Sequence, residues 1–95
     1  MVTDRQLVFR AHALRRMFER NISVDDVRHV VATGETIFEY PDDHPLPSRL
    51  ILGWVSVEPI HVVAADEASS DITMVVTVYR PDPSQWSWDL RRRRR

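Results

Sequence analysis

The apolar residues of this 95-residue chain change their spacing at Gly34, and this change restricts the possible folds more than any other feature. Before Gly34 they recur every three or four residues, as on one face of a helix. After Gly34 they occur in short runs rich in β-branched residues, bounded by proline and polar residues, as in strands. The order predicts an α+β domain in which two N-terminal helices pack on one face of a four-stranded antiparallel sheet.

Two short helices are predicted before Gly34. The first covers residues 11–20. Three of its apolar residues are spaced for burial: Leu14, Met17 and Phe18. The second begins at Ser23, a favourable N-cap residue followed by two aspartates in the first turn, and ends at Gly34.

Four strands are predicted after Gly34, and their short connections favour an antiparallel meander. They cover residues 36–40, 49–55, 60–65 and 72–79. Alternation in the last strand assigns to the helix side Ile72, Met74, Val76 and Val78, and to the other side Thr73, Val75, Thr77 and Tyr79. Antiparallel sheets often leave one face in water, so the face with Thr77 and Tyr79 is expected to be open and able to hold a site.

The composition limits the chemistry and the location of the protein. The chain has no cysteine, which excludes disulfides, thiolate metal sites and cysteine nucleophiles. Residues 1–90 are predicted to form one domain and residues 91–95, all arginine, a disordered tail that could also hold a phosphate backbone or an acidic partner. No apolar segment has the length of a membrane span or a signal peptide, so a soluble cytoplasmic protein without membrane contact is expected.

The charge is unevenly distributed. All 13 basic residues are arginine, and without the terminal run the chain has eight arginines against 14 acidic residues, a formal charge of −6. Such an acidic body argues against broad, nonspecific nucleic-acid binding. Residues 1–28 have a net charge of +2 and residues 29–90 a net charge of −8. Any RNA binding is therefore expected to be local.

His12, Arg16 and Arg20 recur every fourth residue of the first predicted helix. Each step of four rotates a helix by only about 40°, so the three side chains form a stripe that could bind one phosphate or carboxylate. The alternative is a solvated helix face whose arginines pair with nearby acidic residues. Because Arg20 lies nearest the acids of the second helix, it is predicted to be the more structural member.

Seven short segments together resemble a bacterial family known as domain of unknown function family 4258. They are His12–Arg20 with Ile22, Gly34–Glu35, Tyr40–Asp43, Pro47–Leu50, Gly53–Trp54, Ile60–Val63 and Thr77–Asp82. No single segment is specific, but their order and spacing are, and they extend over nearly the whole chain.

The family is distantly similar to the RelE and MqsR type toxins, which implies a RelE/barnase-like toxin fold and a metal-independent ribonuclease of the mRNA interferase type. The resemblance also implies a small antitoxin protein as partner, besides RNA. The chain departs from those toxins because it has no lysine and an acidic body, and this departure bears on RNA cleavage more than on the fold.

Metal-free RNA cleavage needs a base for the ribose 2′-hydroxyl, an acid for the leaving 5′-oxygen and cations for the phosphorane. The predicted catalytic residues are His12, His61 and Tyr79. The predicted phosphate- or RNA-binding residues are Arg16, Arg49 and Arg80. Trp54 could stack on a base if its face is open.

Each residue also has a structural alternative. His61 opens an apolar strand, where a histidine is more often a hydrogen-bonded structural group, and His12 could fix the first helix on the sheet. The four histidines are scattered without metal-ligand spacing, so no metal and no cofactor are predicted. The alternative function is a noncatalytic binding module that holds an acidic protein or the ribosome.

Overall fold

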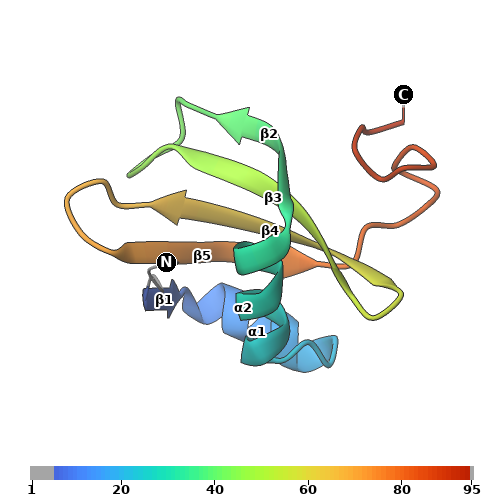
Figure 1. Cartoon of the computed structure of the whole chain (residues 1–95), viewed down its shortest axis with the longest axis horizontal. Coiled ribbons are helices and arrows are strands. Elements are labelled where there is room, and N and C mark those ends of the chain that lie inside the picture. Colours follow the sequence, from blue (N-terminus) through green and yellow to red (C-terminus); the bar gives the residue numbers. More distant parts are fainter. Residues whose placement is uncertain (1–5, 95) are drawn as a thin grey trace.

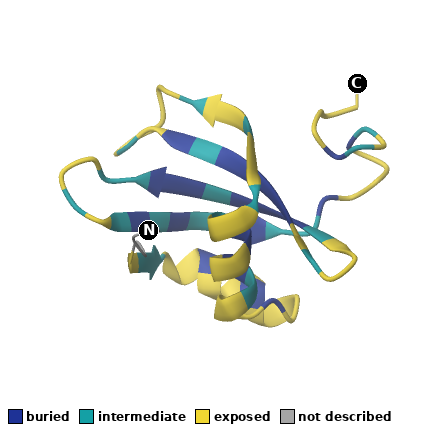
Figure 2. Ribbon diagram, viewed as in Figure 1, coloured by how far each residue is buried: buried dark blue, intermediate teal, exposed yellow. Residues whose placement is uncertain are grey.

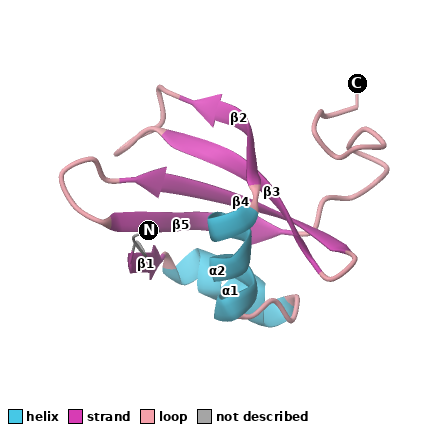
Figure 3. Cartoon of the chain, in the orientation of Figure 1, coloured by secondary structure: helices cyan, strands magenta, loops and turns pink. Residues whose placement is uncertain are grey.

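A twisted mixed sheet with both helices on one face forms the body of the protein in the computed structural model, which describes residues 6–94 (Figure 1). The elements are β1 (Gln6–Phe9), α1 (Ala11–Glu19), α2 (Val24–Thr33), β2 (Glu35–Tyr40), β3 (Ser48–Val55), β4 (Glu58–Asp66) and β5 (Ile72–Tyr79). Figure 3 shows the helices grouped on one side and a long irregular segment after β5. Residues 1–5 of the predicted domain and Arg95 of the predicted tail lie outside the described residues.

The sheet has five strands in the order β1-β5-β4-β3-β2, which corrects the predicted four-stranded antiparallel sheet. β2 to β5 form the expected antiparallel meander, whereas β1 pairs with β5 in parallel, from Gln6 opposite Ile72 to Phe9 opposite Val75. Four residues are too few to show an alternation in the sequence, and their partner strand is distant along the chain. The sequence therefore contains no local signal for β1.

Local chemistry explains both ends of α2. The Ser23 hydroxyl accepts a hydrogen bond from the Asp26 backbone N–H, and the Asp26 carboxylate accepts one from the Ser23 N–H, both at 3.0 Å, which confirms the predicted N-cap. Gly34 follows the helix at φ −76°, so it is required for space and not for a left-handed turn. A Cβ there would lie 2.5 Å from the Val30 carbonyl oxygen and 2.6 Å from Ile51 Cγ2.

The main core lies between the helices and the sheet, where buried strand residues meet both helices (Figure 2). Along α1 the buried residues are Ala13 and Met17, whereas Leu14 is 44% exposed and Phe18 is 88% exposed. The predicted burial of Leu14 and Phe18 is therefore wrong. α1 packs mainly against β5, so only a narrow stripe of its surface is covered.

A bulge in β5 changes the predicted faces of its first half. Val63 pairs with Thr77 and Ala64 with Val75, so Val76 has no partner in β4. The extra residue brings Thr73 and Val75 to the helix side, where both are fully buried, instead of the predicted opposite side. After the bulge the prediction is correct, because Val78 joins the main core and Tyr79 joins the second cluster.

The face predicted to be open is partly covered by residues 84–94, here named the C-terminal strap. Its Trp86 and Leu90 form a second apolar cluster with Leu50 and Leu52 of β3. The strap closes on itself, since the Ser87 N–H donates to the Arg92 carbonyl at 2.7 Å and the Arg94 N–H to the Gln85 carbonyl at 2.8 Å. Residues 91–94 of the predicted disordered tail thus make defined contacts in the structure. Within residues 6–94, no helix is both long and apolar enough to cross a membrane.

Candidate functional site

The main candidate site is a cleft at the free edge of β5. β1 pairs with β5 only as far as Val75, and α1 begins two residues after β1 ends. The second half of β5 therefore has α1 beside it instead of another strand, and side chains from the helix and from the far sheet face can meet there. The cleft has a volume of about 350 Å³ and is lined by His12, Arg16 and Arg20, by Thr77, Val78, Tyr79 and Arg80, and by Asp82, Gln85, Trp86 and Arg93.

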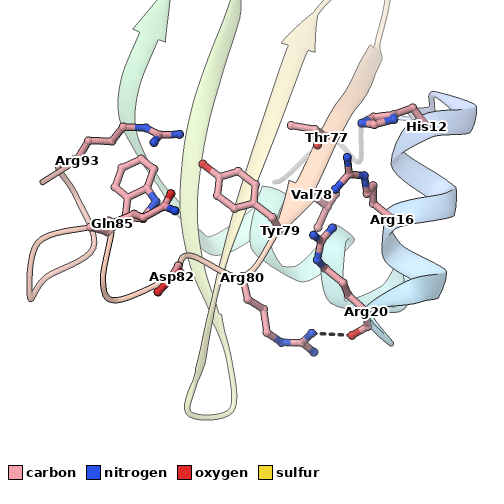
Figure 4. A pocket seen from close by; sticks show the side chains of 11 residues that line it. His12, Arg16, Arg20, Thr77, Val78, Tyr79, Arg80, Asp82, Gln85 and Arg93 are labelled. Atoms are coloured by element: carbon pink, nitrogen blue, oxygen red, sulfur yellow. Dashed lines mark hydrogen bonds between the residues drawn. The ribbon is translucent and has the colours of Figure 1, made fainter.

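The stripe on α1 lines one wall of this cleft. His12, Arg16 and Arg20 extend from the helix toward β5 and Tyr79 (Figure 4). None of the three forms an ion pair with another described residue, so the alternative in which the arginines pair with acids of the helices does not occur among residues 6–94. Four arginines and one aspartate line the cleft, which is therefore locally cationic on a protein with a net charge of −1.

Tyr79 forms the floor of the cleft and is held by a buried histidine of β4. Tyr79 stands opposite His61 in the strand register, and its hydroxyl lies 3.1 Å from His61 Nδ1. His61 Nε2 lies 2.9 Å from the Leu90 carbonyl of the strap, and Trp86 packs edge-on against the imidazole at 4.5 Å. A carbonyl only accepts, so Nε2 carries the proton, and in the neutral ring Nδ1 accepts the Tyr79 hydroxyl.

Burial shifts the pKa values of His61 and Tyr79 in the directions that favour the uncharged form of each side chain. Desolvation lowers the pKa of His61 below its ordinary value of 6.5, although the hydrogen bond to Leu90 opposes this. Desolvation also raises the pKa of Tyr79, with a smaller effect in the same direction from Tyr40, whereas the charge of Arg93 lowers it. At neutral pH the pair therefore consists of a neutral imidazole and a protonated phenol.

The lowered pKa of His61 predicts a loss of stability in mild acid. Well above pH 6.5 His61 is neutral in both states and the stabilisation is fully present. As the pH falls below 6.5, the unfolded chain takes up a proton that the folded protein binds only at lower pH, so the free energy of unfolding decreases. Urea denaturation between pH 7.5 and 5.0 should show this decrease.

His61→Gln is the control for this prediction, because glutamine retains a donor and an acceptor but does not titrate. Its free energy of unfolding should change less with pH over the same range. Hydrogen bonds from Ser84 and Ser87 lower the pKa values of Asp82 and Asp89. These two carboxyl groups therefore change the free energy of unfolding only near and below pH 3.8, their ordinary pKa. Parallel pH profiles for the wild type and His61→Gln would contradict the assignment.

Two of the predicted phosphate ligands make hydrogen bonds and ion pairs within the protein. Arg49 lies at the opposite end of the sheet, where its Nε binds Asp66 at 3.1 Å and its Nη1 binds the Thr36 hydroxyl at 3.1 Å. Arg80 lines the cleft, but its Nη1 donates to the Arg20 carbonyl at 2.6 Å and its Nε lies 3.5 Å from Glu58 (Figure 4). Arg80 therefore connects the end of α1 to the end of β5.

The structure brings together His12, Arg16 and Tyr79 in one cleft, with His61 in contact with Tyr79 from beneath. It adds Arg20, which the sequence analysis assigns to structure although the helical spacing already places it in the stripe. It also adds Arg93 and Trp86 of the strap. The guanidinium carbon of Arg93 lies over the Trp86 ring, 5.3 Å from the ring centre. No periodic signal in the sequence identifies these two, because the strap is irregular.

Among residues 6–94, no group of three or more histidine, cysteine, aspartate or glutamate side chains could hold a metal ion.

A family model described as Domain of unknown function (DUF4258) matches residues 9–80, which include α1, His61 and Tyr79 but not the strap. No curated protein and no solved structure gives a significant match. Since the family model covers most of the chain, the protein belongs to the DUF4258 family.

Proposed function

We propose that the protein is a metal-independent endoribonuclease that cleaves single-stranded RNA in the cleft between α1 and β5. The observation that carries this proposal is the convergence of an imidazole, two arginines that form no ion pair within residues 6–94, and a phenol held by a buried imidazole. These are the groups that metal-free phosphodiester cleavage requires: proton acceptor, proton donor and cations.

Tyr79 is the group that accepts the proton of the ribose 2′-hydroxyl. Its own hydroxyl proton is directed at His61 Nδ1, so the phenol oxygen takes up the 2′-proton while its proton passes to His61. The 2′-oxygen then bonds to phosphorus. His61 is fully buried and does not touch RNA, so it acts as a positioning residue and proton acceptor behind Tyr79.

His12 and the arginines complete the reaction on the other wall. His12, in its protonated form, donates to the 5′-oxygen as the bond between phosphorus and that oxygen breaks. Arg16 and Arg20 bind the phosphate oxygens and stabilise the additional negative charge of the phosphorane. The products are a 2′,3′-cyclic phosphate and a 5′-hydroxyl, and return of the His61 proton through Tyr79 to His12 restores the site.

The excess of arginine in the cleft answers the objection that a chain with an acidic body binds RNA poorly. Four arginines and one aspartate line the cleft, so phosphate binding does not depend on the net charge of the chain. The resemblance to RelE and MqsR type toxins supports the same activity, with a RelE/barnase-like fold, a small antitoxin partner and a cytoplasmic location. The competing proposal is a noncatalytic module with this fold that holds an acidic protein or the ribosome.

Arg16→Ala is expected to slow RNA cleavage by about 10- to 100-fold, because it removes one charge-assisted contact to the phosphorane. Purified protein should cleave a fluorescent single-stranded RNA in buffer with EDTA and release ends with 2′,3′-cyclic phosphate and 5′-hydroxyl. Arg15→Ala is the matched control, since Arg15 is an exposed arginine of the same helix that does not line the cleft.

Equal effects of the Arg15 and Arg16 substitutions would contradict the assignment of the cleft. Absence of cleavage from every RNA tested, together with no growth arrest on induced expression, would overturn the ribonuclease. Binding of RNA or of an acidic protein without cleavage would then favour the noncatalytic module.

A further inference from the structure

A second groove lies on the other side of the C-terminal strap, away from the cleft. One of its two cavities, of about 480 Å³, lies along β2 and is lined by Phe38, Arg91 and Arg92 among others. The other, of about 360 Å³, is lined by His29, Trp54 and Arg91 among others. Because Arg91 and Glu35 line both cavities, the two form one surface, here named the strap groove.

The strap groove combines exposed aromatic rings with arginines. Trp54 is 48% exposed although the rest of β3 is largely buried, and Phe38 is 58% exposed on the mostly exposed strand β2. Aromatic rings beside cations form the surfaces on which proteins stack the bases of single-stranded nucleic acids and hold their phosphates. An apolar partner alone would not require the cations.

The two arginines of the strap groove differ in their contacts. Arg91 pairs with Glu35 at 2.5 Å, which anchors the strap to the start of β2 and neutralises much of the Arg91 charge. Arg92 forms no ion pair with another described residue and is exposed. Arg92 is therefore the side chain best able to hold an anion there.

The strap connects the groove to the cleft. Arg93 lines the cleft, and Arg91 and Arg92 line the groove, so the Cα atoms of Arg91 and Arg93 are at most about 7 Å apart. An RNA chain whose scissile phosphate lies in the cleft would cross the strap beside Arg93 and reach Arg92 within the next nucleotides.

We propose that the strap groove is a second subsite, which binds single-stranded RNA beside the cleavage position through base stacking on Trp54 and Phe38 and a phosphate contact to Arg92. The path of the RNA from the cleft to the strap groove rests on the proposed ribonuclease function. The binding itself takes place outside the cleft. The proposal predicts that affinity increases with RNA length beyond the nucleotides that fit in the cleft.

The test measures binding of an eight-nucleotide RNA with 2′-O-methyl groups, which cannot be cleaved, by fluorescence anisotropy. Trp54→Ala is expected to weaken this binding about 10-fold, because one base loses its stacking platform, and Arg92→Ala is expected to weaken it and to reduce its salt dependence. Trp88→Ala is the matched control. Trp88 is 90% exposed and lines neither the cleft nor the groove.

The outcomes separate this proposal from the ribonuclease. Weaker RNA binding by the Trp54 and Arg92 variants, in a protein that cleaves no RNA, would support the subsite and overturn the enzyme. Normal cleavage together with unchanged RNA affinity in both variants would overturn the subsite. An acidic protein segment would then be the favoured ligand of the strap groove. Because both side chains are exposed, the variants should fold, as circular dichroism will verify.

Discussion

Tyr79→Phe is expected to lower the rate constant of RNA cleavage by about 100- to 1,000-fold, the size of a lost general acid–base group. The ring remains in its place against His61 and the second apolar cluster, so the substitution removes only the hydroxyl. His61 Nδ1 loses its donor, which should reduce the free energy of unfolding by about 1 to 2 kcal/mol. In the proposed mechanism the arginines bind the substrate, so its binding should change little.

Steady-state cleavage of the fluorescent RNA, with kcat and KM determined separately, measures this effect. The matched control is Tyr40→Phe, since Tyr40 packs in the same cluster but does not line the cleft. The loss should appear in kcat for Tyr79→Phe only. A Tyr79→Phe protein that cleaves RNA within a few-fold of the wild type would show that another group accepts the 2′-proton.

His61→Ala is expected to reduce the free energy of unfolding by about 3 to 5 kcal/mol, the range for removal of a large buried side chain. His61 is fully buried and contacts Tyr79, Trp86 and the Leu90 carbonyl, so alanine leaves a cavity and a carbonyl without its donor. Leu90 has a left-handed backbone (φ 64°), which is unfavourable for a leucine and depends on such contacts.

Urea denaturation gives the stability, and trypsin cleavage within residues 91–94 reports whether the strap is released. His12→Ala is the matched control, because it removes an exposed imidazole and should change stability by no more than about 0.5 kcal/mol. The prediction fails if both histidine variants are equally stable or if the strap remains resistant to trypsin in His61→Ala.

The fold was predictable wherever a segment carried its own periodic pattern. α2 with its Ser23 cap, the meander of β2 to β5 and the outward direction of Tyr79 all follow from local spacing and capping. β1 and the bulge at Val76 were not predictable, because their pairing depends on residues of distant strands. The exposure of Phe18 follows from the way α1 packs on β5, which the residue spacing within one helix does not specify.

The candidate site was predictable in part for the same reason. The stripe of His12, Arg16 and Arg20 is a property of one helix, so the spacing alone identified it. The pairing of His61 with Tyr79 depends on the register between β4 and β5. The contribution of Arg93 depends on how the irregular strap folds back.

The sequence by itself determined which faces carry the candidate site residues: a cationic stripe on the first helix and a tyrosine on the sheet face opposite the helices. Only the tertiary structure decided that these two faces share a cleft. A helix on one face of a sheet reaches the other face only where the sheet ends, and β1 ends at Phe9, beside the middle of β5. The tertiary structure also buried His61 beneath Tyr79, because the strap closes over the imidazole that a solvent-open face would have exposed.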